Sequence, residues 1–167
     1  MYNYEKKTER FCNNGIELVR FTSVRACFEK LKTIDEFYNN LLSNCYKWCS
    51  SELLSKAELE YNEDPDPAKR FHYLRYNYLC DFSITAEKGE LVCIKTDISL
   101  YRRRGENISY YTDAQVWNIT NMSMLSPRDV LLAENLLKSA KKPLPSSVML
   151  NGNDVMILEN NVWKNVG

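Results

Sequence analysis

The sequence has no excess of charge of either sign. Its 167 residues include 22 lysines and arginines against 22 aspartates and glutamates. A nucleic-acid-binding domain normally has a clear basic excess, so this balance argues against nucleic acid as a partner. The five glycines and five prolines are about half of average usage, which excludes collagen-like and Pro/Gly-rich disordered classes. The glycine-rich loops G-x-G-x-x-G and G-x-x-x-x-G-K-[ST], which cradle phosphates, are also missing.

Long apolar runs are missing as well. The first ten residues, MYNYEKKTER, are polar and mixed in charge, which is not the pattern of a signal peptide. The longest apolar run is far shorter than the roughly 20 residues that cross a bilayer. The sequence therefore predicts a cytoplasmic protein that does not engage a membrane.

Histidine occurs once, as His72, so a site built from several histidines is excluded. The six cysteines could form disulfides in a secreted chain, but in the cytoplasm we expect reduced and mostly buried thiols. Cys45 and Cys49 are four residues apart and share a helix face that could present two thiolates to a metal. Because that face is apolar and a second cysteine pair is lacking, packing is the preferred interpretation. We expect no metal and no cofactor.

A long helix is the clearest element of the sequence. Thr33 to Glu36 match a capping box, and the apolar residues that follow keep helical spacing to about Tyr61. Pro65 and Pro67 cannot continue the helix. We expect the helix to lie across a sheet with Trp48 buried. The side chains predicted to meet are Phe37, Leu41 and Trp48 of the helix, and Tyr78, Phe82 and Ile94 or Ile98 of the sheet.

The spacing of apolar residues changes to two after the prolines. Residues 74–85 and 92–100 alternate between apolar and polar, and Gly89 closes the short turn between them. Residues 108–119, rich in tyrosine, threonine and valine, suit a third strand. These segments predict an antiparallel β-meander. Residues 16–21 are interpreted as one more strand at an edge.

The C-terminal third predicts a short helix and short strands. Ser126 before Pro127 is typical of a helix start, and we expect this second helix to end near residues 141–143. Residues 148–150, 155–158 and 162–163 are expected to form a C-terminal hairpin. Residues 1–167 are thus predicted to be a single α+β domain, with a long N-terminal helix packed on an antiparallel β-meander, a second short helix and a C-terminal hairpin.

The densest cluster of charge and aromatic residues follows the second strand of the meander. Arg102, Arg103 and Arg104 stand next to Tyr101 and close to Tyr110. Guanidinium groups beside aromatic rings can bind anions or acidic proteins, so these five residues are the candidate ligand site. The alternative interpretation is a hairpin end that positive charge keeps soluble and unpaired.

The order of these segments resembles a known bacterial family. The residues that carry the likeness are 34–38 in the helix start, 76–85 and 91–101 in the first two strands, and 111–118 in the third. These segments are similar in sequence and order to the domain of unknown function that forms the extracellular part of RsiV-type anti-sigma factors. They are similar in particular to short clostridial versions of this domain. The resemblance covers about residues 34–131. It implies an α+β fold and a role in binding.

Two functions follow from these observations. The first is a non-catalytic binding or accessory domain of a bacterial protein, whose ligand is an unknown protein or an anionic group. The alternative is a small hydrolase or thiol enzyme that uses His72 with a nearby cysteine or carboxylate. A pocket that brings His72 within hydrogen-bond reach of such a group would favour the enzyme.

Overall fold

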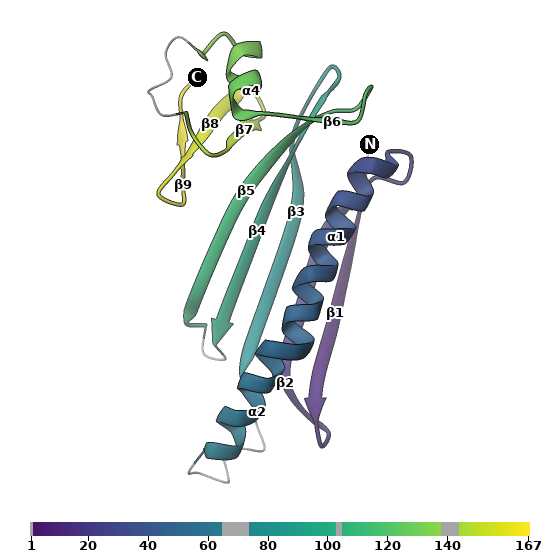
Figure 1. The fold of residues 1–167 in the computed structure, drawn as a ribbon, viewed down its shortest axis with the longest axis vertical. Coiled ribbons are helices and arrows are strands. Elements are labelled where there is room, and N and C mark those ends of the chain that lie inside the picture. The colour runs from purple at the N-terminus through teal and green to yellow at the C-terminus, as the bar shows by residue number, and fades with distance from the viewer. Residues whose placement is uncertain (1, 65–73, 103–104, 138–143) are drawn as a thin grey trace.

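The chain forms two β-sheets and one long helix (Figure 1). The structure, a computed structural model, describes residues 2–64, 74–102, 105–137 and 144–167. The strands are β1 (Asn3–Asn13), β2 (Ile16–Cys27), β3 (Tyr76–Lys88), β4 (Leu91–Arg102), β5 (Asn107–Asn118), β6 (Ser123–Leu125), β7 (Val148–Asn151), β8 (Asp154–Glu159) and β9 (Val162–Asn165). The helices are α1 (Lys32–Trp48), the π-helical η1 (Cys49–Leu53), α2 (Leu54–Glu63) and α4 (Pro127–Ala133).

The predicted fold class is wrong, because the chain is mostly β and its long helix lies in the middle of the sequence. Two strands precede the helix, and the six-stranded sheet has the order β1-β2-β3-β4-β5-β6. Strand β1 is not predicted from the sequence because most of its residues are exposed and polar or charged, so apolar and polar residues do not alternate along it. Residues 16–21 belong to β2, which is an internal strand between β1 and β3 and not an edge.

The helix is the crossover between two parallel strands. Strand β2 pairs with β3 in parallel, with Val19 opposite Tyr76 and Arg25 opposite Phe82. Parallel neighbours require the chain to return to the same end of the sheet, and a helix is the usual way to do so. The antiparallel meander β3-β4-β5 predicted from the alternation is confirmed. Within the described residues, none of the helices is long and apolar enough to span a membrane.

The start of the helix differs from the predicted capping box. The cap position is Leu31, whose carbonyl accepts the Asp35 N–H at 2.9 Å, and no side chain caps the first turn. The Asp35 carboxylate instead accepts the N–H of Phe28 at 3.2 Å and pairs with Arg25 of β2. The acidic group therefore fastens the helix start to the sheet.

A π-helical turn keeps one side of the long helix on the sheet. Cys45, Cys49, Leu53 and Ala57 follow one another at intervals of four, and each such step rotates an α-helix by about 40°. A regular helix would carry Ala57 about 120° away from Cys45. The wider turn of η1 offsets this drift. Cys49, Leu53 and Ala57 all remain buried against the sheet.

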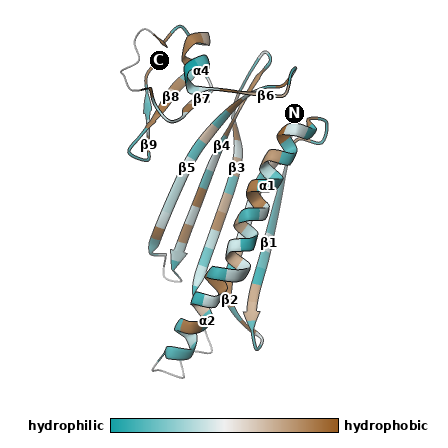
Figure 2. Cartoon of the chain, in the orientation of Figure 1, coloured by the Kyte–Doolittle hydropathy of each residue, from teal (hydrophilic) through white to brown (hydrophobic). Residues whose placement is uncertain are grey.

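Tyr38 lies at the centre of the helix–sheet interface. Its side chain is fully buried, and its ring centroid lies 5.2 Å from that of Phe82. Phe37 contacts Trp117 of β5 at 5.2 Å, and hydrophobic and hydrophilic residues alternate along α1 (Figure 2). The expected burial of Trp48 is wrong, because Trp48 is 37% exposed. Its ring contacts that of Tyr78 in a tilted arrangement, with the ring centroids 5.7 Å apart.

A second core lies on the opposite face of the sheet. Successive residues of a strand point to opposite faces, so Val92 faces the helix while Cys93 faces α4, β7 and β8. The predicted C-terminal strands are confirmed as the antiparallel sheet β7-β8-β9. The Ser126 hydroxyl accepts the Asp129 N–H at 3.2 Å and caps α4 as expected. This helix ends at Ala133, whereas the expected end at 141–143 lies outside the described residues.

Candidate functional site

The structure divides the predicted ligand site between the two faces of the sheet. Tyr101 and Arg102 are neighbours on β4 and therefore point to opposite faces. Tyr110 lies opposite Ser99 in the β4–β5 register, which places it on the same face as Tyr101. Arg103 and Arg104 lie outside the described residues. The tyrosines and Arg102 thus belong to two different surfaces.

The tyrosine surface is a polar part of the sheet face that the helix does not cover. The Tyr110 hydroxyl donates to Asp97 Oδ1 at 2.6 Å, and Lys95 Nζ lies 3.2 Å from Asp97 Oδ2. Burial and the hydrogen bond to the carboxylate raise the pKa of Tyr110. Asn161 of the β8–β9 turn donates to the Tyr110 carbonyl at 3.0 Å, so the C-terminal sheet borders this surface.

Two carboxylates oppose each other on the same surface. Asp81 of β3 stands directly across from Asp97 of β4, an arrangement that costs free energy when both groups are charged. Burial and the charge of Asp97 raise the pKa of Asp81, while Lys95 acts in the opposite direction. Asp81 and Asp97 are both polar positions of alternating segments in the sequence. That they form a pair becomes evident only when the register of β3 and β4 is known.

Arg102 belongs to a different group of side chains, at the end of the molecule where α2 ends. The Arg102 guanidinium carbon lies 5.6 Å from the centroid of the Tyr76 ring, and Lys56 Nζ of α2 lies 5.7 Å from it. We call Lys56, Tyr76 and Arg102 the distal basic cluster. Burial and a hydrogen bond to Glu60 raise the pKa of Tyr76 to about 12, so the ring remains a neutral phenol.

The ion pairs of Arg102 are long. Its Nη1 lies 3.9 Å from Glu60 Oε2 and its Nε lies 3.8 Å from Glu106 Oε2, both beyond hydrogen-bond distance. The Arg102 backbone is better fixed, because its N–H donates to the Glu106 carbonyl at 2.8 Å and its carbonyl accepts the Gly105 N–H at 3.0 Å. Gly105 has a φ of +81°, which suits a residue without a side chain. The hairpin end therefore holds Arg102 in place while its charge is only loosely paired.

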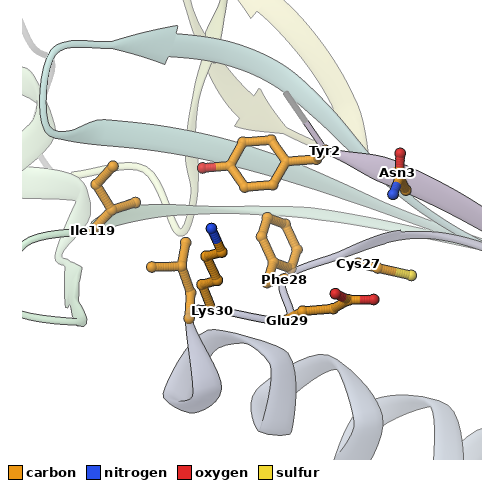
Figure 3. A pocket seen from close by; sticks show the side chains of 8 residues that line it. Tyr2, Asn3, Cys27, Phe28, Glu29, Lys30 and Ile119 are labelled. Carbon is orange, nitrogen blue, oxygen red and sulfur yellow. The ribbon is translucent and has the colours of Figure 1, made fainter.

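A cavity of about 400 Å³ lies near the N-terminal end of β1 (Figure 3). Tyr2 and Phe28 form its aromatic wall, with ring centroids 5.0 Å apart, and Lys30 reaches between them and Ile119 (Figure 3). A second cavity of about 200 Å³ lies between β1, β2 and α1, where buried Arg25 pairs with Asp35. Sequence reasoning missed both cavities, because their linings come from segments that it did not place side by side.

All six cysteines are free thiols, as expected. Cys49, Cys80 and Cys93 are buried, Cys27 and Cys45 are half-buried, and Cys12 is exposed, so fewer thiols are buried than predicted. In the part of the chain that the structure describes, no three potential metal ligands lie together. His72 lies outside the described residues, so its proximity to a thiol or carboxylate stays a prediction.

The fold is similar to that of two solved bacterial structures. One is a DUF3298 family protein from Pseudomonas aeruginosa PAO1, with a TM-score of 0.53, 13% identity, and coverage of 94% of this chain and 82% of that chain. The other is a member of the same family from Bacteroides fragilis, with a TM-score of 0.56, 10% identity, and coverage of 93% and 82%. No protein-family model and no curated protein matches the sequence.

At these identities the similarity concerns the fold alone. DUF3298 proteins are related to the extracellular domain of RsiV. The chain therefore shares its fold with a family related to the one that its sequence resembles.

Proposed function

We propose that this chain is a non-catalytic bacterial binding domain, related to RsiV-type extracellular domains, that binds an acidic segment of a partner protein at the distal basic cluster. The observation that carries the proposal is the convergence of two cationic side chains on one buried aromatic ring. Lys56 comes from α2 and Arg102 from β4, and both lie within 6 Å of the Tyr76 centroid, at 5.7 and 5.6 Å.

The geometry of Arg102 suits a bidentate acceptor. A guanidinium held near an aromatic ring has a fixed plane, and its parallel N–H groups match the two oxygens of a carboxylate. The present partners of Arg102 lie at 3.8 and 3.9 Å, so an incoming carboxylate at hydrogen-bond distance would replace weak contacts with stronger ones. The Arg102 side chain is 46% exposed and open to such a group.

Lys56 adds charge without adding rigidity. Its ammonium is a point charge on a flexible stem, so it can follow a second carboxylate of the same segment. The Glu60 carboxylate lies 3.9 Å from Arg102 Nη1 and disfavours isolated small anions that cannot displace this contact. An acidic peptide offers several carboxylates at once and overcomes this competition.

We expect Arg102→Ala to weaken binding of a fluorescein-labelled hexaglutamate peptide about tenfold, which corresponds to about 1.4 kcal/mol. The reason is the loss of one charge-assisted bidentate contact. Fluorescence anisotropy with the full chain measures the affinity. Because exposed charges are screened over roughly 8 Å at physiological ionic strength, raising the salt concentration should weaken the wild-type complex.

Arg128→Ala is the matched control. Arg128 is an exposed arginine of α4, at the end of the molecule opposite to α2 (Figure 1). Its loss removes the same charge and should leave the affinity unchanged, whereas Lys56→Ala should weaken binding. Equal losses for Arg102→Ala and Arg128→Ala would show that net charge alone attracts the peptide, and the proposed site would be wrong.

A further inference from the structure

The cavity at the N-terminal end of β1 is enclosed by three segments that are distant in sequence. They are the start of the chain before and in β1, the connection between β2 and α1, and the residue that follows β5. Its volume of about 400 Å³ is within the range of about 300–1,000 Å³ that is usual for small-molecule sites. The cavity lies at the start of α1, whereas the distal basic cluster lies where α2 ends (Figure 1). It is therefore a separate site from that cluster.

The aromatic wall of the cavity is fixed in place. The ring of Phe28 is buried, and its centroid lies 5.0 Å from that of Tyr2 and 6.1 Å from that of Tyr38. The Phe28 N–H donates to Asp35 Oδ1 at 3.2 Å, and the Phe28 carbonyl accepts the Leu31 N–H at 2.9 Å. Because the wall is held by these contacts before a ligand arrives, binding costs little conformational entropy there.

Two polar groups of the lining are donors that the described residues leave unused. Figure 3 shows Lys30 extending into the cavity toward the Tyr2 ring, whereas the Glu29 carboxylate points away from it, on the side of Cys27. Within the described residues, the Lys30 ammonium forms no ion pair and the Tyr2 hydroxyl forms no hydrogen bond. Burial and the charge of Glu87 raise the pKa of Tyr2, so its hydroxyl keeps its proton and can donate it in a hydrogen bond.

We propose that this cavity binds a small aromatic carboxylate. The ring of the ligand lies against Tyr2 and Phe28, where pairs of aromatic rings gain free energy beyond the burial of their area. The carboxylate accepts one hydrogen bond from the Lys30 ammonium and one from the Tyr2 hydroxyl. A hydrogen bond between an ammonium and a carboxylate is charge-assisted, and it is therefore stronger than one between neutral groups.

A negative charge on the ligand is what the charges of the lining favour. A cationic ligand on the aromatic wall would approach the Lys30 ammonium, which repels it. Among the described lining residues Glu29 carries the only carboxylate, and that carboxylate points away from Lys30 (Figure 3). A neutral ligand would fill the apolar part of the cavity but would leave the ammonium without a counter-charge. The ligand class is therefore an aromatic ring with one carboxylate.

The first test measures the binding of 2-naphthoate to the full chain by isothermal titration calorimetry. We expect Lys30→Gln to weaken the affinity about tenfold, because it removes one charge-assisted hydrogen bond. Lys32→Gln is the matched control. Lys32 is exposed and lies outside the cavity lining, so its loss removes the same charge and should leave the affinity unchanged. Equal losses in the two variants, or no binding of 2-naphthoate by the wild type, would contradict the proposal.

The second test changes the ligand. 2-Naphthamide keeps the rings without the charge, so it should bind the wild type more weakly than 2-naphthoate does, and Lys30→Gln should not weaken it further. Octanoate keeps the carboxylate without a ring and should also bind more weakly than 2-naphthoate. An octanoate affinity equal to that of 2-naphthoate would overturn the aromatic part of the proposal.

Two further variants locate the bound ligand. Tyr2→Leu removes both the ring and the hydroxyl from the wall, so it should weaken 2-naphthoate and 2-naphthamide alike. Arg102→Ala alters the distal basic cluster and should leave the affinity for 2-naphthoate unchanged, so the two proposed sites succeed or fail separately. If Arg102→Ala weakens 2-naphthoate binding while Tyr2→Leu does not, the ligand binds outside this cavity and the proposal is wrong.

Discussion

Replacing Tyr38 with alanine is expected to destabilise the chain by on the order of 3–5 kcal/mol, the cost of deleting a large buried aromatic side chain. Tyr38 is fully buried, and its ring lies among those of Phe28, Phe82 and Trp117. Because α1 supplies this side chain, its loss loosens the helix from the sheet. Urea denaturation followed by tryptophan fluorescence measures the free energy of unfolding.

Two comparison variants separate packing from hydrogen bonding. The Tyr38 hydroxyl donates to Gln115 Oε1 at 2.9 Å and accepts the Trp117 Nε1–H at 3.0 Å. Tyr38→Phe keeps the ring but removes the hydroxyl, so that Gln115 Oε1 and Trp117 Nε1–H each lose one hydrogen-bond partner. We expect this to lower the free energy of unfolding by about 1–3 kcal/mol. Trp48→Ala should cost clearly less than Tyr38→Ala, because Trp48 is 37% exposed. An equal cost would mean that the interface is centred elsewhere.

Asp35→Ala is expected to cost about 3 kcal/mol, much more than Arg25→Met, because the first leaves a buried charge without its counter-ion. Arg25 is 7% exposed and pairs with Asp35, while its Nε donates to the Ala26 carbonyl at 3.2 Å. Methionine in its place keeps the apolar stem and removes the charge. Asp35, which is 30% exposed, can then turn to water.

A double-mutant cycle checks this asymmetry. The double variant Arg25→Met with Asp35→Ala should be more stable than Asp35→Ala alone, since no charge then remains buried. Thermal or urea unfolding of the four proteins gives the coupling free energy. If Arg25→Met lowers the free energy of unfolding more than Asp35→Ala does, the prediction is wrong. The Arg25–Asp35 ion pair would then contribute net stability, beyond the neutralisation of the buried Arg25 charge.

The helix and the meander were readable from sequence because their signals are local. Helical spacing ran to about Tyr61 and the structure ends α2 at Glu63, and the alternation of residues 74–100 marked β3 and β4. Strand β1 carries no such signal, since an exposed edge selects charge and not alternation. The parallel β2–β3 pairing joins distant segments, and no local pattern specifies it. The π-helical turn η1 could not be predicted either, because one extra residue in a turn changes the spacing of the apolar residues too little to be recognised.

The candidate site was readable only in part. Charge and aromatic content marked Arg102, but the period of two that defines the strand also sends Tyr101 to the other face. Lys56 and Tyr76 stand far from Arg102 in sequence and reach it through the crossover and the β3–β4 register, in which Tyr76 faces Arg102. Composition identifies a residue, whereas its neighbours depend on topology.

The parallel ladder between β2 and β3 also bears on how the chain folds. The hairpin β1–β2 and the meander β3-β4-β5 each form from neighbouring segments, but the ladder must wait for the whole crossover to close. Contacts between distant segments form slowly because loop closure costs entropy first. During synthesis β2 leaves the ribosome well before β3, with Leu18 and Phe21 uncovered. We expect this hairpin to be the segment most open to misassembly in the nascent chain.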